Sequence, residues 1–295
     1  MGRAVSVVEG VRRRLWRGYA DGRRRIRRSG SAVPAMTIFG KQSRNAPSMW
    51  ADVTSERHER YRSANPVPSG SVAIVCVSRR PHLLHHFVKN VERQIGIENA
   101  IEVVFVANAP GFVNDEVEQA FASLPHARVD HAPTGTSLGQ GLNQGMSMTG
   151  ARFIAKFDDD DLYGSAFLAD ALRAHSYAGA GVVGKHSYYA HLRSRNETVI
   201  RFPSHEFCYS STLAGGTLVI DRDVVGDQEF PDVSLGEDRA FIARCHRRGI
   251  STFSADRFNF TQIRDGGNTW RLADEDFLIG TESVGSGWPE SEINR

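Results

Sequence analysis

Four short apolar runs alternate with helix-like stretches between residues 71 and 157, and this order is the strongest constraint on the fold. The runs are "SVAIVCVS" (71–78), "IEVVFVA" (101–107), "ARVDHA" (127–132) and "ARFIAKF" (151–157). Their length and composition are typical of buried strands, and the stretches between them have helical character. Strands that alternate with helices over short connections pair in parallel. The pattern therefore predicts an α/β fold with a mostly parallel central sheet flanked by helices.

The second half of the chain predicts a more mixed arrangement. Two strand-like runs, 181–190 and 197–202, follow a helix that begins near Ser165, and another helix spans 236–249. We therefore expect one domain over residues 70–270, an arm and linker over 1–69, and an acidic, loose tail over 271–295. Hydrophobic residues make up 40% of the chain, which is typical of globular proteins. No run of 18 apolar residues exists, so the sequence predicts no transmembrane helix.

The arm is strongly basic, unlike the rest of the chain. Its first 30 residues contain ten arginines against Glu9 and Asp21, which gives +8, so the remainder of a chain of net charge +2 carries −6. One interpretation is an amphipathic helix that contacts an anionic membrane surface or a partner. The other is a solvated tail. We expect no specific nucleic-acid partner.

The three cysteines, Cys76, Cys208 and Cys245, are far apart and form no CxxC pair. This usage is typical of a reducing compartment and excludes a disulfide framework or a zinc knuckle. We therefore expect a cytoplasmic protein, in peripheral contact with the inner face of the membrane if the arm binds there.

Four consecutive carboxylates, Asp158 to Asp161, directly follow the fourth apolar run. Ligands of open α/β sheets lie at the carboxyl ends of strands. Lys156 alone cannot neutralise four neighbouring charges, whereas Mg²⁺ or Mn²⁺ would, because both favour carboxylate oxygens. Asp158 and Asp160 are the candidate ligands. The alternative is a polar turn in which Asp161 caps the next helix.

Two further motifs have both a structural and a functional interpretation. Glu237 and Asp238 of "GED" open a predicted helix, where the helix dipole favours acidic residues whether or not they are catalytic. Gly215 and Gly216 of "GGT" allow a ligand to approach the backbone closely, or mark a strand bulge.

The order of these motifs resembles that of family 2 glycosyltransferases, which have the Rossmann-like GT-A fold. The family pattern LGxxxNxG, FxDxDD, GGT and GED corresponds here to "LGQGLNQG", the acidic segment in "KFDDDDLY", "GGT" and "GED". The resemblance covers about residues 70–270. It implies a nucleotide-sugar donor, a hydroxyl acceptor and inversion at the anomeric carbon, with a divalent cation, Mn²⁺ or Mg²⁺, as cofactor.

The resemblance also implies which residues contact the donor. Asn108 stands where the family usually has an acidic residue that contacts the base, and Leu142 replaces the arginine that precedes Asn143. The implied donor-binding residues at the strand ends and in the motifs are Val77, Ser78, Arg79, Asn108, Asn143, Lys156, Asp158 and Asp159.

The reacting groups follow from the same resemblance. Asp160, together with Asp158, would bind the metal that bridges the diphosphate. Asp238 would be the general base, with Glu237 beside it. The implied acceptor side consists of Gly215, Gly216, Thr217 and Trp270.

Some members of the family carry "HTW" downstream, and this chain has "NTW", residues 268–270. Asn268 can donate to a phosphate but is a poorer metal ligand than histidine. Arg264, four residues earlier, is either a bidentate partner of the diphosphate or a surface residue.

We therefore interpret the sequence as a metal-dependent glycosyltransferase, of the kind that builds bacterial polysaccharides or glycoconjugates. A nucleotidyltransferase is the alternative enzyme, but it should have a Gly-rich basic loop after the first strand, where only Arg79 and Arg80 stand. A non-catalytic, degenerate transferase that recruits partners is the alternative from another class.

Overall fold

The computed structural model describes residues 55–98, 100–266 and 272–294, which contain two sheets. The larger sheet has the strand order β3-β2-β1-β4-β10-β6-β11-β9. Its strands are β1 Val72–Ser78, β2 Ile101–Ala107, β3 Ala127–His131, β4 Phe153–Lys156, β6 Val182–Gly184, β9 Cys208–Tyr209, β10 Val219–Asp221 and β11 Thr252–Ser254.

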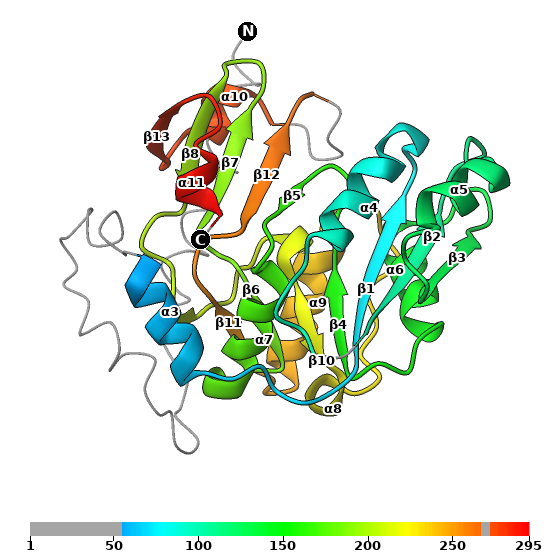
Figure 1. Ribbon diagram of the computed structural model, residues 1–295, viewed down its shortest axis with the longest axis horizontal. Coiled ribbons are helices and arrows are strands. Elements are labelled where there is room, and N and C mark those ends of the chain that lie inside the picture. Colours follow the sequence, from blue (N-terminus) through cyan, green and yellow to red (C-terminus); the bar gives the residue numbers. More distant parts are fainter. Residues whose placement is uncertain (1–54, 99, 267–271, 295) are drawn as a thin grey trace, which may run out of the picture. The chain divides into compact units, whose positions relative to one another are not determined.

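The strands β1 to β4 are all parallel, which confirms the predicted α/β sheet (Figure 1). Val75 of β1 is in register with Lys156 of β4, and Ser78 of β1 with Ala107 of β2. The carboxyl ends of these strands therefore share one edge of the sheet, which we call the carboxyl edge. Antiparallel β10 lies between β4 and β6 and begins at this edge, so the turn that leads into β10 lies there as well.

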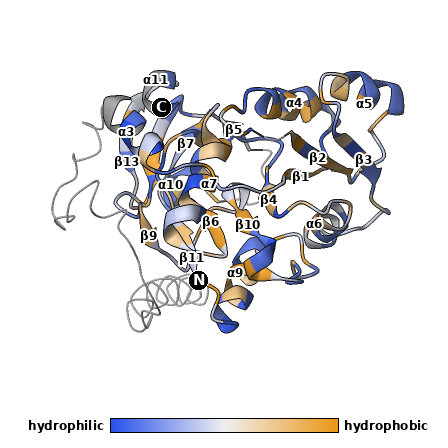
Figure 2. Cartoon of the chain, turned by 60° about the horizontal axis from the view of Figure 1, so that its bottom comes forward, coloured by the Kyte–Doolittle hydropathy of each residue, from blue (hydrophilic) through white to orange (hydrophobic). Residues whose placement is uncertain are grey.

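Helices cover both faces of this sheet (Figure 1). Apolar side chains of α4 (Leu84–Glu92), α5 (Asn114–Phe121) and α7 (Phe167–Ala178) form one buried cluster with one face of the strands. Those of α6 (Leu138–Ser147) and α9 (Glu237–Arg247) form another with the opposite face. A strand buried on both faces needs apolar residues at every position. Figure 2 accordingly shows β1 and β2 as hydrophobic.

The glycines of α6 allow this helix to pack closely on the sheet. A Cβ at Gly141 would lie 2.8 Å from Cγ1 of Val77, and one at Gly145 would lie 2.7 Å from Cγ1 of Val75. These distances are too short for any side chain, so the Gly-rich stretch sets the separation between helix and strand. The N-terminus of α6 has a capping box, in which Ser137 and Gln140 bond each other's backbone N–H.

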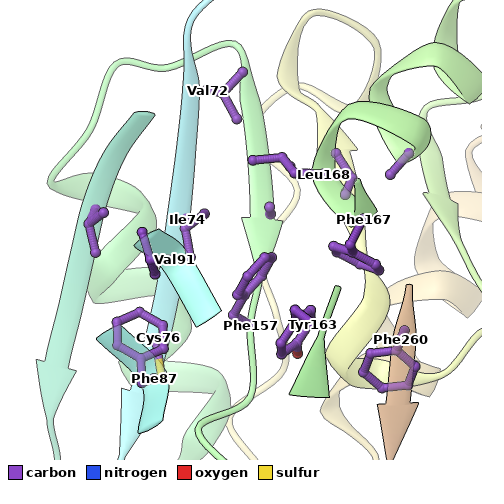
Figure 3. Packing of buried hydrophobic residues seen from close by; sticks show 14 of the residues in the cluster. Val72, Ile74, Cys76, Phe87, Val91, Phe157, Tyr163, Phe167, Leu168 and Phe260 are labelled. Atoms are coloured by element: carbon purple, nitrogen blue, oxygen red, sulfur yellow. The ribbon is translucent and has the colours of Figure 1, made fainter. Parts of the chain in front are cut away.

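Aromatic side chains form the core between the two sheets (Figure 3). The rings of Phe157 and Tyr163 stack with centroids 3.8 Å apart, and Phe167 and Phe260 meet the Tyr163 ring edge-on. All four residues are fully buried. The segment after β4 is therefore anchored in the core on both sides of its acidic residues.

The smaller sheet has the order β13-β8-β7-β12-β5. Its strands are β5 Leu162–Tyr163, β7 Tyr188–Leu192, β8 Glu197–Arg201, β12 Phe260–Arg264 and β13 Glu282–Ser286. Together with the mixed half of the larger sheet, it confirms the predicted mixed second half. The remaining short elements are α3 Ser55–Ala64, η1 Pro81–Leu83, η2 Gly215–Thr217, α8 Arg222–Val225, α10 Asp274–Phe277 and α11 Glu290–Ile293.

The tail expected to be loose is folded over residues 272–294. Strand β13 pairs antiparallel with β8. Phe277 is fully buried between the guanidinium groups of Arg201 and Arg264, which lie 4.0 and 4.2 Å from its ring centroid. A few apolar and aromatic residues in an acidic, Ser- and Gly-rich segment were therefore enough to order it. The basic arm, residues 1–30, lies outside the described residues. Within the described part of the chain, no helix has the length and apolar character needed to span a membrane.

Candidate active site

The acidic segment Asp158–Asp161 follows β4 at the carboxyl edge. Three other segments converge on it: the turn after β1, the η2 turn before β10 and the N-terminus of α9. The prediction that the acidic segment lies at the carboxyl end of a buried strand is confirmed. Each of its four carboxylates has a different environment.

Asp159 and Asp160 both pair with Arg80, which lies in the turn after β1. The guanidinium donates to both Asp159 oxygens, with Nε 3.2 Å from Oδ2, and Nη1 donates to Asp160 Oδ2 at 2.6 Å. The Ser78 hydroxyl also donates to Asp159. Burial raises the pKa of Asp160, while Arg80 opposes that shift. Asp159 is thus fully engaged inside the protein, whereas the Asp160 side chain remains 13% exposed.

Lys156 pairs with Asp158 and extends toward α9. Its Nζ donates to Asp158 Oδ1 at 2.6 Å and lies 3.9 Å from Glu237 Oε1. Burial by itself lowers the pKa of this ammonium, but Asp158, Glu237 and Asp238 outweigh burial and raise the pKa above its ordinary value. Lys156 is therefore a buried, charged link between the acidic segment and the "GED" motif.

Asp161 is a structural carboxylate. Its Oδ1 accepts the backbone N–H of Ile263 in β12 at 3.0 Å, and its carbonyl accepts a hydrogen bond from Asn90 at 2.8 Å. Burial raises the pKa of this carboxyl well above its usual range. The next helix, α7, begins at Phe167 with Ala166 as its N-cap, so the alternative in which Asp161 caps a helix is wrong.

The two glycines of "GGT" each contact a different carboxylate. A Cβ at Gly215 would overlap with Oδ2 of Asp238, and a Cβ at Gly216 would lie 2.8 Å from Oδ2 of Asp158. The adjacent Thr217 shapes the turn, because its hydroxyl donates to Ala214 O and accepts the backbone N–H of Lys185. The carboxylates of Asp238 and Asp158 therefore lie against two adjacent residues of this turn, Gly215 and Gly216.

Tyr163 joins this turn to the acidic segment. Its hydroxyl donates to Gly216 O at 2.6 Å and accepts the backbone N–H of Asp158 at 2.8 Å. Neither Tyr163 nor Arg80 is among the site residues predicted from the sequence. The signal for Arg80 was the excess of carboxylates, which calls for a second cation besides Lys156. The signal for Tyr163 was a hydroxyl-bearing aromatic directly after the acidic segment.

The "GED" carboxylates differ in burial. Glu237 is buried beside Lys156, and burial raises its pKa, with Lys156 opposing the shift. Asp238 is half-buried, and its Oδ1 accepts the backbone N–H of Arg239 at 2.6 Å. Asp238 is therefore the carboxylate of this pair with access to a bound molecule.

Several residues implied as donor contacts have partners within the protein. The Asn143 amide bonds both the N–H and the carbonyl of Phe230, each at 2.9 Å, and so fixes the loop before α9. Asn108 donates to Thr136 O at 3.0 Å. Arg264 donates to Leu272 O at 2.7 Å and stacks on Phe277, which ties it to residues 272–277.

Other implied residues lie at the edge itself or outside the described chain. Val77 is half-buried against α6 near the end of β1, and Arg79 is exposed in the turn that follows. Asn268 and Trp270 lie outside the described residues.

The donor set at this edge fits a divalent cation. Carboxylates outnumber the cations that contact them, since Arg80 and Lys156 face the four aspartates of the acidic segment as well as Glu237. The side chains of Asp158 and Asp160 are 34% and 13% exposed, and carboxylate oxygens suit Mg²⁺ and Mn²⁺. No group of three or more His, Cys, Asp or Glu side chains in the described residues is arranged to hold a metal by itself. A bound cation would thus need further oxygen ligands from water or substrate.

One comparison with known proteins identifies a family. The family model described as "Glycosyl transferase family 2" matches residues 71–218, half of the chain. A search of curated proteins found no match.

Two solved structures illustrate the shared GT-A fold. Residues 1–349 of S. aureus TarS, in complex with UDP-GlcNAc, are 15% identical with a TM-score of 0.55, over 71% of this chain and 64% of that one. The mannosyltransferase PcManGT from Pyrobaculum calidifontis, in complex with GDP-Man and Mn²⁺, is 14% identical with a TM-score of 0.55, over 76% of this chain and 68% of that one. The chain thus spans less than two thirds of the length of the TarS fragment.

Proposed function

The chain belongs to glycosyl transferase family 2, and we propose that it transfers a sugar from a nucleotide-diphosphate donor to an acceptor hydroxyl, with a divalent cation and with inversion. The observation that carries this proposal is the η2 turn, where Gly215 contacts Asp238 and Gly216 lies against Asp158. Asp238 would serve the acceptor and Asp158 the donor, and the two carboxylates lie against adjacent residues of one turn. TarS with UDP-GlcNAc and PcManGT with GDP-Man and Mn²⁺ support a nucleotide-sugar donor.

On the donor side, Asp158 and Asp160 would hold the cation. When bound, that cation would neutralise the negative charge that develops on the leaving diphosphate. Lys156 orients Asp158 through the 2.6 Å contact of Nζ with Oδ1, and Tyr163 fixes the backbone of the same residue. These contacts prearrange the donor side before any ligand arrives, which lowers the cost of binding.

On the acceptor side, Asp238 would be the general base. The acceptor oxygen attacks the anomeric carbon, the bond from that carbon to the diphosphate oxygen breaks, and the hydroxyl proton passes to Asp238. A single displacement of this kind inverts the anomeric centre. Asp238 lies in the first turn of α9, and its Oδ2 is positioned against Gly215 of the η2 turn. Glu237, buried beside Lys156, would balance the charge of that lysine.

The alternatives from the sequence gain no support. The turn after β1 runs from Ser78 through Arg79 and Arg80 to Pro81, so the Gly-rich loop expected of a nucleotidyltransferase is absent from it. A degenerate, non-catalytic transferase would have no need to hold the carboxylates of Asp158 and Asp238 close to the same turn, as the η2 turn does here.

A screen of nucleotide sugars tests the proposal without knowledge of the acceptor. Release of nucleoside diphosphate is measured with Mn²⁺, with Mg²⁺ and with EDTA, and we expect hydrolysis of a UDP- or GDP-sugar that EDTA abolishes. Asp160→Asn should remove most of the metal-dependent affinity for UDP or GDP in calorimetry. Unchanged metal-dependent affinity in this variant would remove Asp160 from the cation site.

Asp238→Asn tests the base. It keeps the shape of the side chain but cannot accept a proton, so the rate should fall by about 10²–10⁴ while donor affinity stays the same. Asp232→Asn, the same change at an exposed position of the loop before α9, is the control and should keep the wild-type rate. A folded Asp238→Asn protein that turns over within about threefold of wild type would contradict the proposed role.

We also propose that residues 1–30 bind an anionic membrane surface. Their charge of +8 beside a body of −6 supports this. The enzyme would then meet its acceptor at that surface.

A further inference from the structure

Arg80 contacts the same carboxylate that the proposed function assigns to the cation. The guanidinium is 27% exposed and joins the turn after β1 to the acidic segment after β4. Its Nη1 donates to Asp160 Oδ2 at 2.6 Å, and its Nε and Nη2 donate to Asp159. Its backbone N–H donates to the Ser78 hydroxyl oxygen at 3.0 Å, and that hydroxyl donates to Asp159.

The two carboxylates bound by Arg80 differ in their exposure to solvent and in their other hydrogen-bond donors. Asp159 is nearly inaccessible and has Ser78 as a second donor, so it serves as the anchor of the guanidinium. Asp160 is more exposed, and Arg80 donates to it through Nη1. Arg80 can therefore release Asp160 while it remains attached to Asp159.

A guanidinium and a divalent cation at Asp160 would repel each other. Like charges within a few ångströms in a partly buried site interact strongly, because screening by water is weak there. A diphosphate reverses this balance, since its oxygens can coordinate the cation and accept hydrogen bonds from arginine, which binds phosphate in a bidentate manner. The guanidinium would then contact the diphosphate in place of Asp160.

We propose that Arg80 makes the binding of the divalent cation depend on the nucleotide diphosphate. Without the donor, Arg80 occupies Asp160 and weakens binding of the free cation. With the donor, the diphosphate accepts both positive charges, so that cation and nucleotide each strengthen the binding of the other. This inference rests on the proposed function, since it requires a divalent cation at Asp160.

Calorimetry on the full chain tests the inference without turnover. Mn²⁺ alone, UDP or GDP alone, and the nucleotide with saturating Mn²⁺ are titrated into wild type and Arg80→Gln. Arg80→Gln should bind Mn²⁺ alone about tenfold more tightly, which corresponds to about 1.4 kcal/mol. The gain in nucleotide affinity that Mn²⁺ produces should be smaller in the variant than in wild type.

Arg152→Gln is the matched control. Arg152 precedes β4 at the opposite end of the same strand, where its guanidinium pairs with Asp221 at 2.8 Å and with Asp223 at 3.0 Å. This variant loses the same charge and a similar pair of contacts, and its Mn²⁺ affinity should equal that of wild type. Arg80→Lys keeps the charge, should fold if Arg80→Gln does not, and should bind Mn²⁺ as weakly as wild type.

The outcomes separate the inference from the proposed function. If Mn²⁺ strengthens nucleotide binding in wild type but Arg80→Gln binds free Mn²⁺ no better than wild type does, the role of Arg80 is overturned and the cation site stands. If Mn²⁺ has no effect on nucleotide binding in wild type, both are overturned. Equal gains in Mn²⁺ affinity for Arg80→Gln and Arg152→Gln would reduce the effect to net charge and overturn the inference.

Discussion

Gly215 lies directly against the carboxylate of Asp238, so closely that any Cβ at this position would overlap with Oδ2. The absence of a side chain at Gly215 is therefore a condition for the position of the candidate base. The next residue, Gly216, has the same relationship to Asp158. Two glycines in sequence thus set the separation between the two carboxylates on which the proposed reaction depends.

Gly215→Ala should lower the rate of donor turnover by about 10²-fold, because a displacement of about 1 Å in a catalytic group has an effect of that size. Asp238 is half-buried and can move aside, so the melting temperature should change little. Gly150→Ala, at a glycine with open space around its Cβ position, is the control. Equal rates for the two variants would show that the position of Asp238 is not critical.

Tyr163→Phe should weaken both stability and activity. The hydroxyl is buried, and its loss leaves the N–H of Asp158 and the carbonyl of Gly216 without this partner, at a cost of about 1–3 kcal/mol in the free energy of unfolding. The link between the acidic segment and the η2 turn is lost as well, so the KM for the donor should rise.

Tyr189→Phe separates these two effects. Tyr189 is also buried, and its hydroxyl accepts a hydrogen bond from Arg257 Nε at 3.2 Å. This variant should lose stability in urea unfolding but keep the wild-type KM. The same KM in both variants would mean that Tyr163 contributes only to the core.

His186 should make stability depend on pH between about 4 and 6.5. Burial, with the charge of His205 as a second cause, lowers the pKa of His186 to about 4 in the folded protein. The unfolded chain therefore binds the proton first, and the contribution of neutral His186 is complete above about pH 6.5 and is lost as the pH falls toward 4. The loss amounts to at most roughly 3 kcal/mol at 1.36 kcal/mol per pH unit.

Urea unfolding of wild type and His186→Gln at several pH values checks this prediction. The difference in unfolding free energy between the two proteins should shrink as the pH falls from about 6.5 to 4, since only wild type has this titrating group. A difference that stays constant over that range would contradict the assigned pKa.

Deletion of residues 1–30 should abolish binding to vesicles that contain anionic lipid and should spare donor hydrolysis. The segment carries +8, and its attraction to the surface should weaken at high salt, where exposed charges are screened. Cosedimentation with anionic and with neutral vesicles measures this. Equal binding by the full-length and shortened proteins would locate any membrane contact elsewhere.

Much of the fold and part of the candidate site could be predicted from local patterns. The apolar runs identified β1, β2, β3 and β4, and the helical spacing identified the helices between them, because burial on both faces imposes a pattern on each segment separately. The acidic segment was correctly placed at a strand end for the same reason. The tail was wrongly expected to be loose, because its few buried residues, such as Phe277, have their partners far away in the chain.

The sequence by itself determined the parallel sheet, the position of Asp158–Asp161 at its carboxyl edge and the mixed character of the second half of the chain. Only the tertiary structure decided which side chains meet there: Arg80 with Asp160, 80 residues apart, and Asn143 with Phe230, 87 residues apart. The physical reason is that hydrophobic periodicity reports which face of an element is buried, whereas a contact between side chains also requires the order and register of the strands. Strand β1 lies between β2 and β4, and that arrangement brings Arg80 to the acidic segment.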